Sequence, residues 1–139
     1  MKKYPLVVLH GWGLSGDRFA PLVGELKRLG YSVFAPDLPG FGKSHVPRRP
    51  LTLSTYAAFL DTYLRDHRLT KPVLLGHSFG GRVALKFNLL YKHRIRALIL
   101  TGVPGFTPIP KRKLALFITV AKLGGLLFAI PPMSLFQEQ

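Results

Sequence analysis

Short apolar runs alternate along the first hundred residues with longer segments whose apolar residues recur at helical spacing. The apolar runs have the length of strands, and we expect strands at 6–10, 31–36, 72–76 and 96–102. The longer segments place their apolar residues on one face, and we expect helices at 17–30, 53–69 and 80–93. Strands and helices that alternate in this way are typical of βαβ units with right-handed crossovers. The pattern therefore predicts an α/β fold, with a parallel sheet of about four strands and helices on both faces.

Polar residues, glycine and proline mark where these elements begin and end. Gly30 is expected to stop the first helix, and Thr52 or Ser54 to cap the start of the second. Residues 37–50, DLPGFGKSHVPRRP, are too rich in glycine and proline for either element and predict a long surface loop. The strand at 72–76 is apolar throughout, which is typical of a strand buried on both faces.

The character of the chain changes near residue 106. We expect residues 1–106 to form the α/β core and residues 107–139 to be a connector and the start of a helical lid. The basic and then apolar segment 111–130 is near the shortest length that can span a membrane, and Lys122 lies near its middle. A lid helix or an interfacial helix accommodates Lys122 better than a span, so we expect no span. Contact of 111–130 with a membrane surface stays open.

Composition narrows the class of protein. The chain of 139 residues is 47% apolar and 19% charged, as expected of one folded domain. Its 20 Lys and Arg exceed its 6 Asp and Glu, which gives a net charge of +14. The basic residues are scattered, and the sequence has no nucleic-acid-binding motif. We therefore expect a solvated basic surface and no specific nucleic-acid partner.

The absence of cysteine and the spacing of the histidines argue against disulfides and metal sites. With no cysteine, the chain can form neither a disulfide nor a thiolate zinc site. The five histidines lack metal-ligand spacing, so we expect no metal site. The apolar run after Lys2 and Lys3 is too short for a signal peptide, which favours a cytoplasmic location.

The strongest chemical signal is GHSFG, which follows the buried strand and precedes a helix. A serine at such a turn, here Ser78, has its hydroxyl lifted clear of the sheet and lies beside the positive end of the helix. Gly76 and Gly80 remove Cβ atoms that would collide where the chain crosses closely. The turn at residues 76–81 matches neither of the two phosphate-binding motifs, GxxxxGK[ST] and GxGxxG. Ser78 is therefore expected to be a nucleophile.

Three motifs together resemble the N-terminal half of the α/β-hydrolase superfamily. They are HGWGLSGDRF after the first strand, PDLPGFGKS after the second and GHSFGG after the third. Their wording is similar to small carboxylesterases of the pimeloyl-carrier methyl ester esterase type. The resemblance covers residues 6 to about 105 and implies the spatial strand order second, first, third, fourth. It also implies that the backbone N–H groups of Trp12 and Phe79 bind the oxyanion, with the ring of Phe79 having no such role.

The family's triad runs Ser, then Asp or Glu, then His, and this chain does not match it after Ser78. The only later acid is Glu138, and the only later histidine is His93, at the end of a helix. His77 should diverge from Ser78 at so sharp a turn. His10 is expected to shape the loop after the first strand.

Three other polar residues are expected to have no catalytic role. Asp37 is expected to stabilise the DLPG turn rather than to orient a catalytic base. His45 and His67 are expected to be solvated.

The resemblance implies a serine hydrolase that acts on a small-molecule carboxylic ester through an acyl-enzyme and needs no metal or organic cofactor. The missing acid and base predict that residues 1–139 are a fragment with negligible activity alone. Two alternatives stay open. The chain could be an inactive truncated relative that serves as a binding module, or a C–C hydrolase or haloperoxidase-type member of the superfamily.

Overall fold

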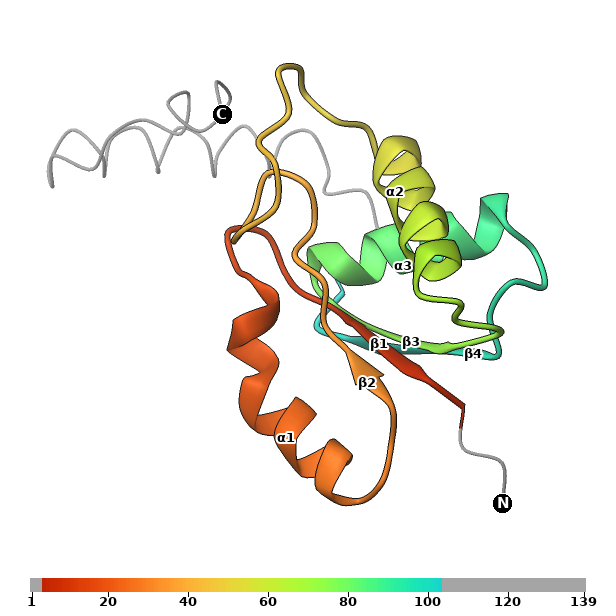
Figure 1. The fold of residues 1–139 in the computed structure, drawn as a ribbon. Helices are drawn as coiled ribbons and strands as arrows, with labels where there is room; N and C mark the ends of the chain where they lie inside the picture. Colours follow the sequence, from red (N-terminus) through yellow and green to blue (C-terminus); the bar gives the residue numbers. More distant parts are fainter. Residues whose placement is uncertain (1–3, 104–139) are drawn as a thin grey trace, which may run out of the picture. The chain divides into compact units, whose positions relative to one another are not determined.

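The computed structural model of the protein describes residues 4–103, which form a parallel sheet flanked by helices (Figure 1). Its strands are β1 (Leu6–Leu9), β2 (Val33–Phe34), β3 (Val73–His77) and β4 (Ala97–Thr101). Its helices are a 3-10 turn (Gly16–Phe19), α1 (Ala20–Arg28), α2 (Leu53–Asp66) and α3 (Phe79–Leu90). The predicted α/β class and the predicted elements are confirmed, with β2 much shorter than expected.

The strand order is β2-β1-β3-β4, and every pair of neighbours is parallel. In the register of the central pair, Leu6 is opposite Val73 and Leu9 is opposite Gly76. This order is the one that the family resemblance implied. The carboxyl ends of the strands therefore meet at one edge of the sheet, and the loops that follow β1, β2 and β3 gather there.

Helices α2 and α3 lie on one face of the sheet, and α1 lies on the other side, next to β2 (Figure 1). The core lies under α2 and α3, where Phe87 and Leu74 are fully buried. On the other face β3 is only partly covered, because Val73 and Leu75 are half-buried and Ile99 of the neighbouring strand is 45% exposed. The expectation that β3 is buried on both faces is therefore wrong for the part of the chain that is described.

The predicted helix ends are largely confirmed. Thr52 caps α2, since its hydroxyl oxygen accepts a hydrogen bond of 3.2 Å from the N–H of Thr55. Gly30 follows α1 in the left-handed region, with φ 80°. An unexpected acid, Asp61, lies on the buried face of α2.

None of the helices within residues 4–103 is long and apolar enough to cross a membrane. The predicted lid at 107–139, the segment 111–130 and the carboxylate of Glu138 lie outside the described residues.

Candidate active site

Ser78 lies on the sharp turn between β3 and α3. Its backbone has φ 49° and ψ −111°, and such a conformation is strained for any residue with a Cβ atom. The turn is fixed to the neighbouring strand β4, because the N–H of Ser78 donates a 2.9 Å hydrogen bond to the carbonyl oxygen of Thr101. The sheet thus fixes the serine at the carboxyl edge, where β3 ends and the N-terminus of α3 begins.

The glycines of the motif allow backbone segments to approach one another. A Cβ atom on Gly76 would lie 2.5 Å from the Cα atom of Gly81, and one on Gly80 would lie 2.6 Å from the carbonyl oxygen of His10. Side chains at both positions would therefore collide with backbone atoms. The steric reason given for these glycines from the sequence is confirmed.

Two backbone N–H groups near Ser78 have no acceptor among the described residues. The N–H groups of Trp12 and Phe79 donate no hydrogen bond to any residue in the range 4–103. The loop that carries Trp12 approaches the serine, because a Cβ atom on Gly11 would lie 3.5 Å from the Cβ of Ser78. Phe79 is the first residue of α3, where helical N–H groups are free and the helix dipole is positive. Such donors suit a negatively charged oxygen.

His10 connects the loops that follow β1 and β2. The ring is fully buried, its Nδ1–H donates to the carbonyl oxygen of Gly11 (2.8 Å), and its Nε2 accepts from the N–H of Leu38 (2.9 Å). A backbone N–H can only donate and a carbonyl can only accept, so the ring is the neutral tautomer with the proton on Nδ1. The structural role expected for His10 is confirmed.

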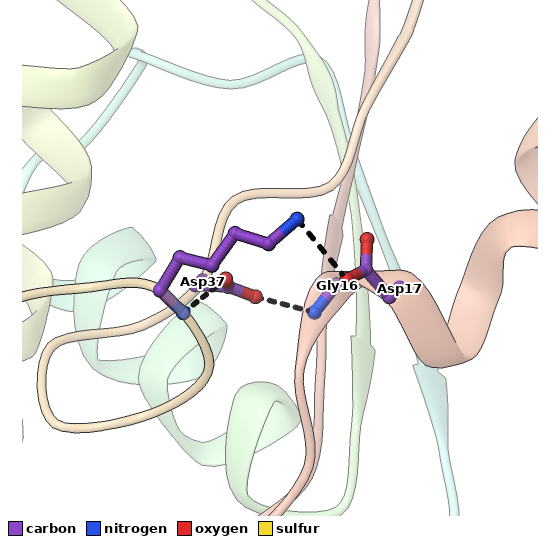
Figure 2. Close-up of polar contacts among 4 residues, drawn as sticks. Gly16, Asp17 and Asp37 are labelled. Atoms are coloured by element: carbon purple, nitrogen blue, oxygen red, sulfur yellow. Dashed lines mark hydrogen bonds and ion pairs between the residues drawn. The ribbon is translucent and has the colours of Figure 1, made fainter.

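Asp37 ties the loop after β2 to the residues that precede α1. One carboxylate oxygen accepts from the N–H of Gly16 (2.7 Å) and the other from the N–H of Lys43 (2.8 Å), and Figure 2 shows the carboxylate between these two groups. The Lys43 ammonium also pairs with the carboxylate of Asp17 at 3.6 Å. Asp37 therefore stabilises its own turn, as expected, and also a second loop that the sequence did not reveal.

The hydrogen bonds of Asp37 favour its charged form. Burial raises the pKa of Asp37, but the N–H groups of Lys43 and Gly16, together with nearby positive charge, lower it more. The pKa therefore lies below its ordinary value of 3.8. A carboxyl with a lowered pKa in the folded state stabilises the fold above the unfolded-state pKa, and that stabilisation is lost as the pH falls through the folded-state pKa.

Replacing Asp37 with asparagine should lower the free energy of unfolding at neutral pH by about 1 to 2 kcal/mol, because a neutral amide can accept only one of the two bonds well. The difference from the unmodified protein should shrink as the pH falls below about 4. Urea denaturation at a series of pH values measures both effects. The exposed Asp66→Asn variant is the control, and a loss that persists unchanged in acid would contradict this role of the carboxylate.

An aromatic cluster that the sequence did not reveal lies beside the turn. The Trp12 ring packs edge-to-face on the rings of Phe41 and Phe79, and the Phe79 ring packs in the same way on Tyr56, each with centroids 5.0 Å apart. The ring of Phe79 therefore has a packing role in addition to the role expected of its backbone. Each of the three motifs contributes an aromatic residue, which is the signal that could have predicted the cluster. Trp12 remains 58% exposed, so the cluster presents an apolar surface to solvent.

No described histidine or carboxylate makes a hydrogen bond to the hydroxyl of Ser78. His77 instead has its Nδ1 3.1 Å from the hydroxyl oxygen of Thr101, and its ring packs against Phe19. His93 lies in the connection between α3 and β4, before the amino end of β4, and so at the opposite edge of the sheet from Ser78. His45 and His67 are exposed, as expected. The described part of the chain also holds no group of acids and histidines arranged for a metal ion.

Comparison with known proteins agrees with the fold. A family model described as the alpha/beta hydrolase fold matches residues 4–129. The abhydrolase domain-containing protein abhd-5.2 of Caenorhabditis elegans is 38% identical over 75% of this chain and 24% of its own length. The AB hydrolase superfamily protein YisY of Bacillus subtilis is 29% identical over 76% of this chain and 41% of its own length.

A solved structure supports the same family. An esterase of Exiguobacterium antarcticum superposes with a TM-score of 0.72 and 30% identity, over 88% of this chain and 49% of its own. The chain thus spans about half of this structure, and between 24% and 41% of the two curated relatives.

Proposed function

Because the chain belongs to the α/β-hydrolase fold family, we propose that it carries the nucleophile of a serine hydrolase that acts on carboxylic esters through an acyl-enzyme. The observation that carries the proposal is the strained backbone of Ser78 between β3 and α3, beside two N–H groups that have no acceptor within residues 4–103. Strain of this kind persists where a precise placement of the side chain is useful.

In the proposed reaction, the Ser78 hydroxyl oxygen attacks the carbonyl carbon of the ester while a base takes its proton. The carbonyl oxygen becomes an oxyanion that accepts hydrogen bonds from the N–H groups of Trp12 and Phe79, and each such donor lowers the barrier by about 3 to 4 kcal/mol. The tetrahedral intermediate then expels the alcohol, which receives the proton, and leaves the acyl group on Ser78. Attack by water on this ester releases the acid and restores the serine.

The proposal includes a base and an acid that lie beyond residue 139. Three observations support this part of the proposal. The ring of His77 is hydrogen-bonded to the hydroxyl of Thr101, and His93 lies at the opposite edge of the sheet from Ser78. The relatives are also much longer than this chain. Loss of a triad member lowers turnover by about 10⁴ to 10⁶, so residues 1–139 alone should show no measurable turnover of an ester.

The proposed nucleophile can be tested on this chain without turnover. We expect p-nitrophenyl acetate, with imidazole as an external base, to acetylate Ser78 at least about tenfold faster than an ordinary exposed serine, because the two N–H groups stabilise the oxyanion. Mass spectrometry of proteolytic peptides measures the rate at each serine. Ser54, which is exposed on α2, is the internal control.

The Trp12→Pro variant removes one of the two N–H groups and should slow acetylation of Ser78 while leaving that of Ser54 unchanged. If Ser78 in the unmodified, folded chain reacts no faster than Ser54, the catalytic proposal is wrong and a non-catalytic binding module is favoured.

A further inference from the structure

We infer that a basic cavity at the edge of the sheet opposite Ser78 binds a phosphate monoester. The cavity has a volume of about 310 Å³ and is lined by the end of α2, the connection from α2 to β3 and the connection from α3 to β4. Its cationic lining residues are Arg65, Arg68, Lys71 and Arg94. Because β3 and β4 begin here and the nucleophile follows the carboxyl end of β3, the cavity is separate from the candidate active site.

Within the described residues, the four cationic side chains of the lining have one ion-pair partner, the carboxylate of Asp61. Asp61, whose side chain is 6% exposed, pairs with Arg65 at 2.9 Å and with Arg94 at 3.1 Å. The Arg94 contact is an ion pair that does not have the geometry of a hydrogen bond, so Oδ1 of Asp61 has no hydrogen-bond partner among residues 4–103. Arg68 and Lys71 make no ion pair in that range. The Asp61 carboxylate thus pairs with two of the four cations, and a bound anion would relieve the repulsion among the four.

The backbone provides a second observation. Only four described residues other than glycine have a positive φ, and three of them line this cavity: Arg68 (53°), Lys71 (46°) and His93 (66°). The fourth is Ser78, the candidate nucleophile. A positive φ costs free energy in a residue other than glycine, and the gathering of three such residues at the cavity is the second observation behind the inference.

The two helix ends in this chain allow a direct comparison. Helix α1 ends in two backbone hydrogen bonds: the N–H of Gly30 donates to the carbonyl oxygen of Lys27, and the N–H of Tyr31 donates to that of Leu26. Gly30 has φ 80°. Helix α2 ends in the same pattern, because the N–H of Arg68 donates to the carbonyl oxygen of Arg65 and the N–H of Leu69 donates to that of Leu64. Glycine is the residue that adopts this conformation without strain, and α1 uses it. At the end of α2 the chain instead has an arginine that faces the cavity.

The lining favours phosphate among anions. Guanidinium groups bind phosphate oxygens through paired N–H donors, and a lysine ammonium adds a compact charge. Two cations without a carboxylate partner match the dianionic form of a phosphate monoester. Thr70 adds a hydroxyl, and the apolar side chains of Leu64 and Leu69 can cover an organic group attached to the phosphate.

The test compares the unmodified chain with the Arg68→Gly, Lys71→Gly double variant. Glycine removes both charges and also relieves both positive φ angles, so the variant should fold and have a higher Tm. Calorimetric titration at low ionic strength with glycerol 3-phosphate should show binding to the unmodified chain, and binding at least about tenfold weaker to the double variant. The Arg48→Gly, Arg49→Gly variant removes the same charge from the exposed loop after β2 and should bind as the unmodified chain does.

A second titration uses vesicles of phosphatidylcholine with and without phosphatidic acid. Binding of glycerol 3-phosphate identifies a soluble ester as a ligand. Binding of phosphatidic acid vesicles alone, lost in the Arg68→Gly, Lys71→Gly variant, identifies a lipid headgroup. The inference is overturned if neither probe binds the unmodified chain, or if both double variants lose binding equally. The Ser78→Ala variant should bind phosphate normally, so this test is independent of the proposed hydrolase activity.

Discussion

The Gly80→Ala variant should lose about 3 kcal/mol or more of folding free energy, out of the 5 to 15 kcal/mol typical of a whole domain. The added Cβ would lie 2.5 Å from the carbonyl carbon of Leu9 and 2.6 Å from the carbonyl oxygen of His10. These are backbone atoms at the carboxyl end of β1, which pairs with strands on both sides and has little freedom to move. Relief of the collision would shift α3 away from the sheet, and with it the turn at Ser78.

The Gly24→Ala variant is the matched control. Gly24 lies inside α1, and a Cβ atom there would meet nothing within 4 Å. The same substitution should therefore raise the free energy of unfolding by about 0.5 to 1 kcal/mol, because alanine is the better helix former. Denaturation in urea, followed by circular dichroism, measures both variants. Equal stability of the two would contradict the tight approach of α3 to β1.

The His10→Ala variant should lose about 2 to 4 kcal/mol, from an unsatisfied buried N–H and a cavity in place of the ring. The N–H of Leu38 would lose its acceptor, and the carbonyl of Gly11 would lose its donor. Both groups belong to loops at the carboxyl edge of the sheet, so those loops should also become more mobile. Hydrogen exchange of the Leu38 amide should report this loss directly.

Two further variants separate the hydrogen bonds of His10 from its volume. His10→Gln keeps an acceptor that can reach the N–H of Leu38 and should be less destabilising than His10→Ala. His45→Ala removes an exposed histidine from the loop after β2 and should leave stability within about 0.5 kcal/mol. If His10→Ala proved as stable as His45→Ala, the link between the two loops would not contribute to stability.

Local pattern predicted most of the fold. Apolar spacing located the strands and helices. Thr52 was one of two predicted caps, with Ser54, because a side-chain oxygen just before the first turn can bond to its N–H groups. The strand order depended on the resemblance to a family, since apolar runs alone do not specify which strands are neighbours. The steric need for Gly76 and Gly80 was predicted from the motif, because the turn itself brings two backbone segments together.

Features that depend on contacts between distant segments were not predicted. The bond from Gly16 to Asp37 joins two loops whose proximity is set by the pairing of β1 with β2. The partial exposure of one face of β3 depends on which elements cover that face, and a run of apolar residues does not specify those elements. The basic cavity combines residues from the end of α2 and from two connections, and its cationic residues appeared in the sequence only as part of a scattered positive charge.

The position of β1 has a consequence for the order of events during synthesis. Leu6 pairs with Val33 on one side and with Val73 on the other, so β1, which is made before the other three described strands, is an inner strand of the sheet. Its second edge stays without a partner until Val73–His77 has been made, which takes several seconds at about 5 to 20 residues per second. During that interval, an apolar strand with a free edge is exposed to other nascent chains. Chaperone binding to the ribosome-bound chain should therefore end when β3 emerges.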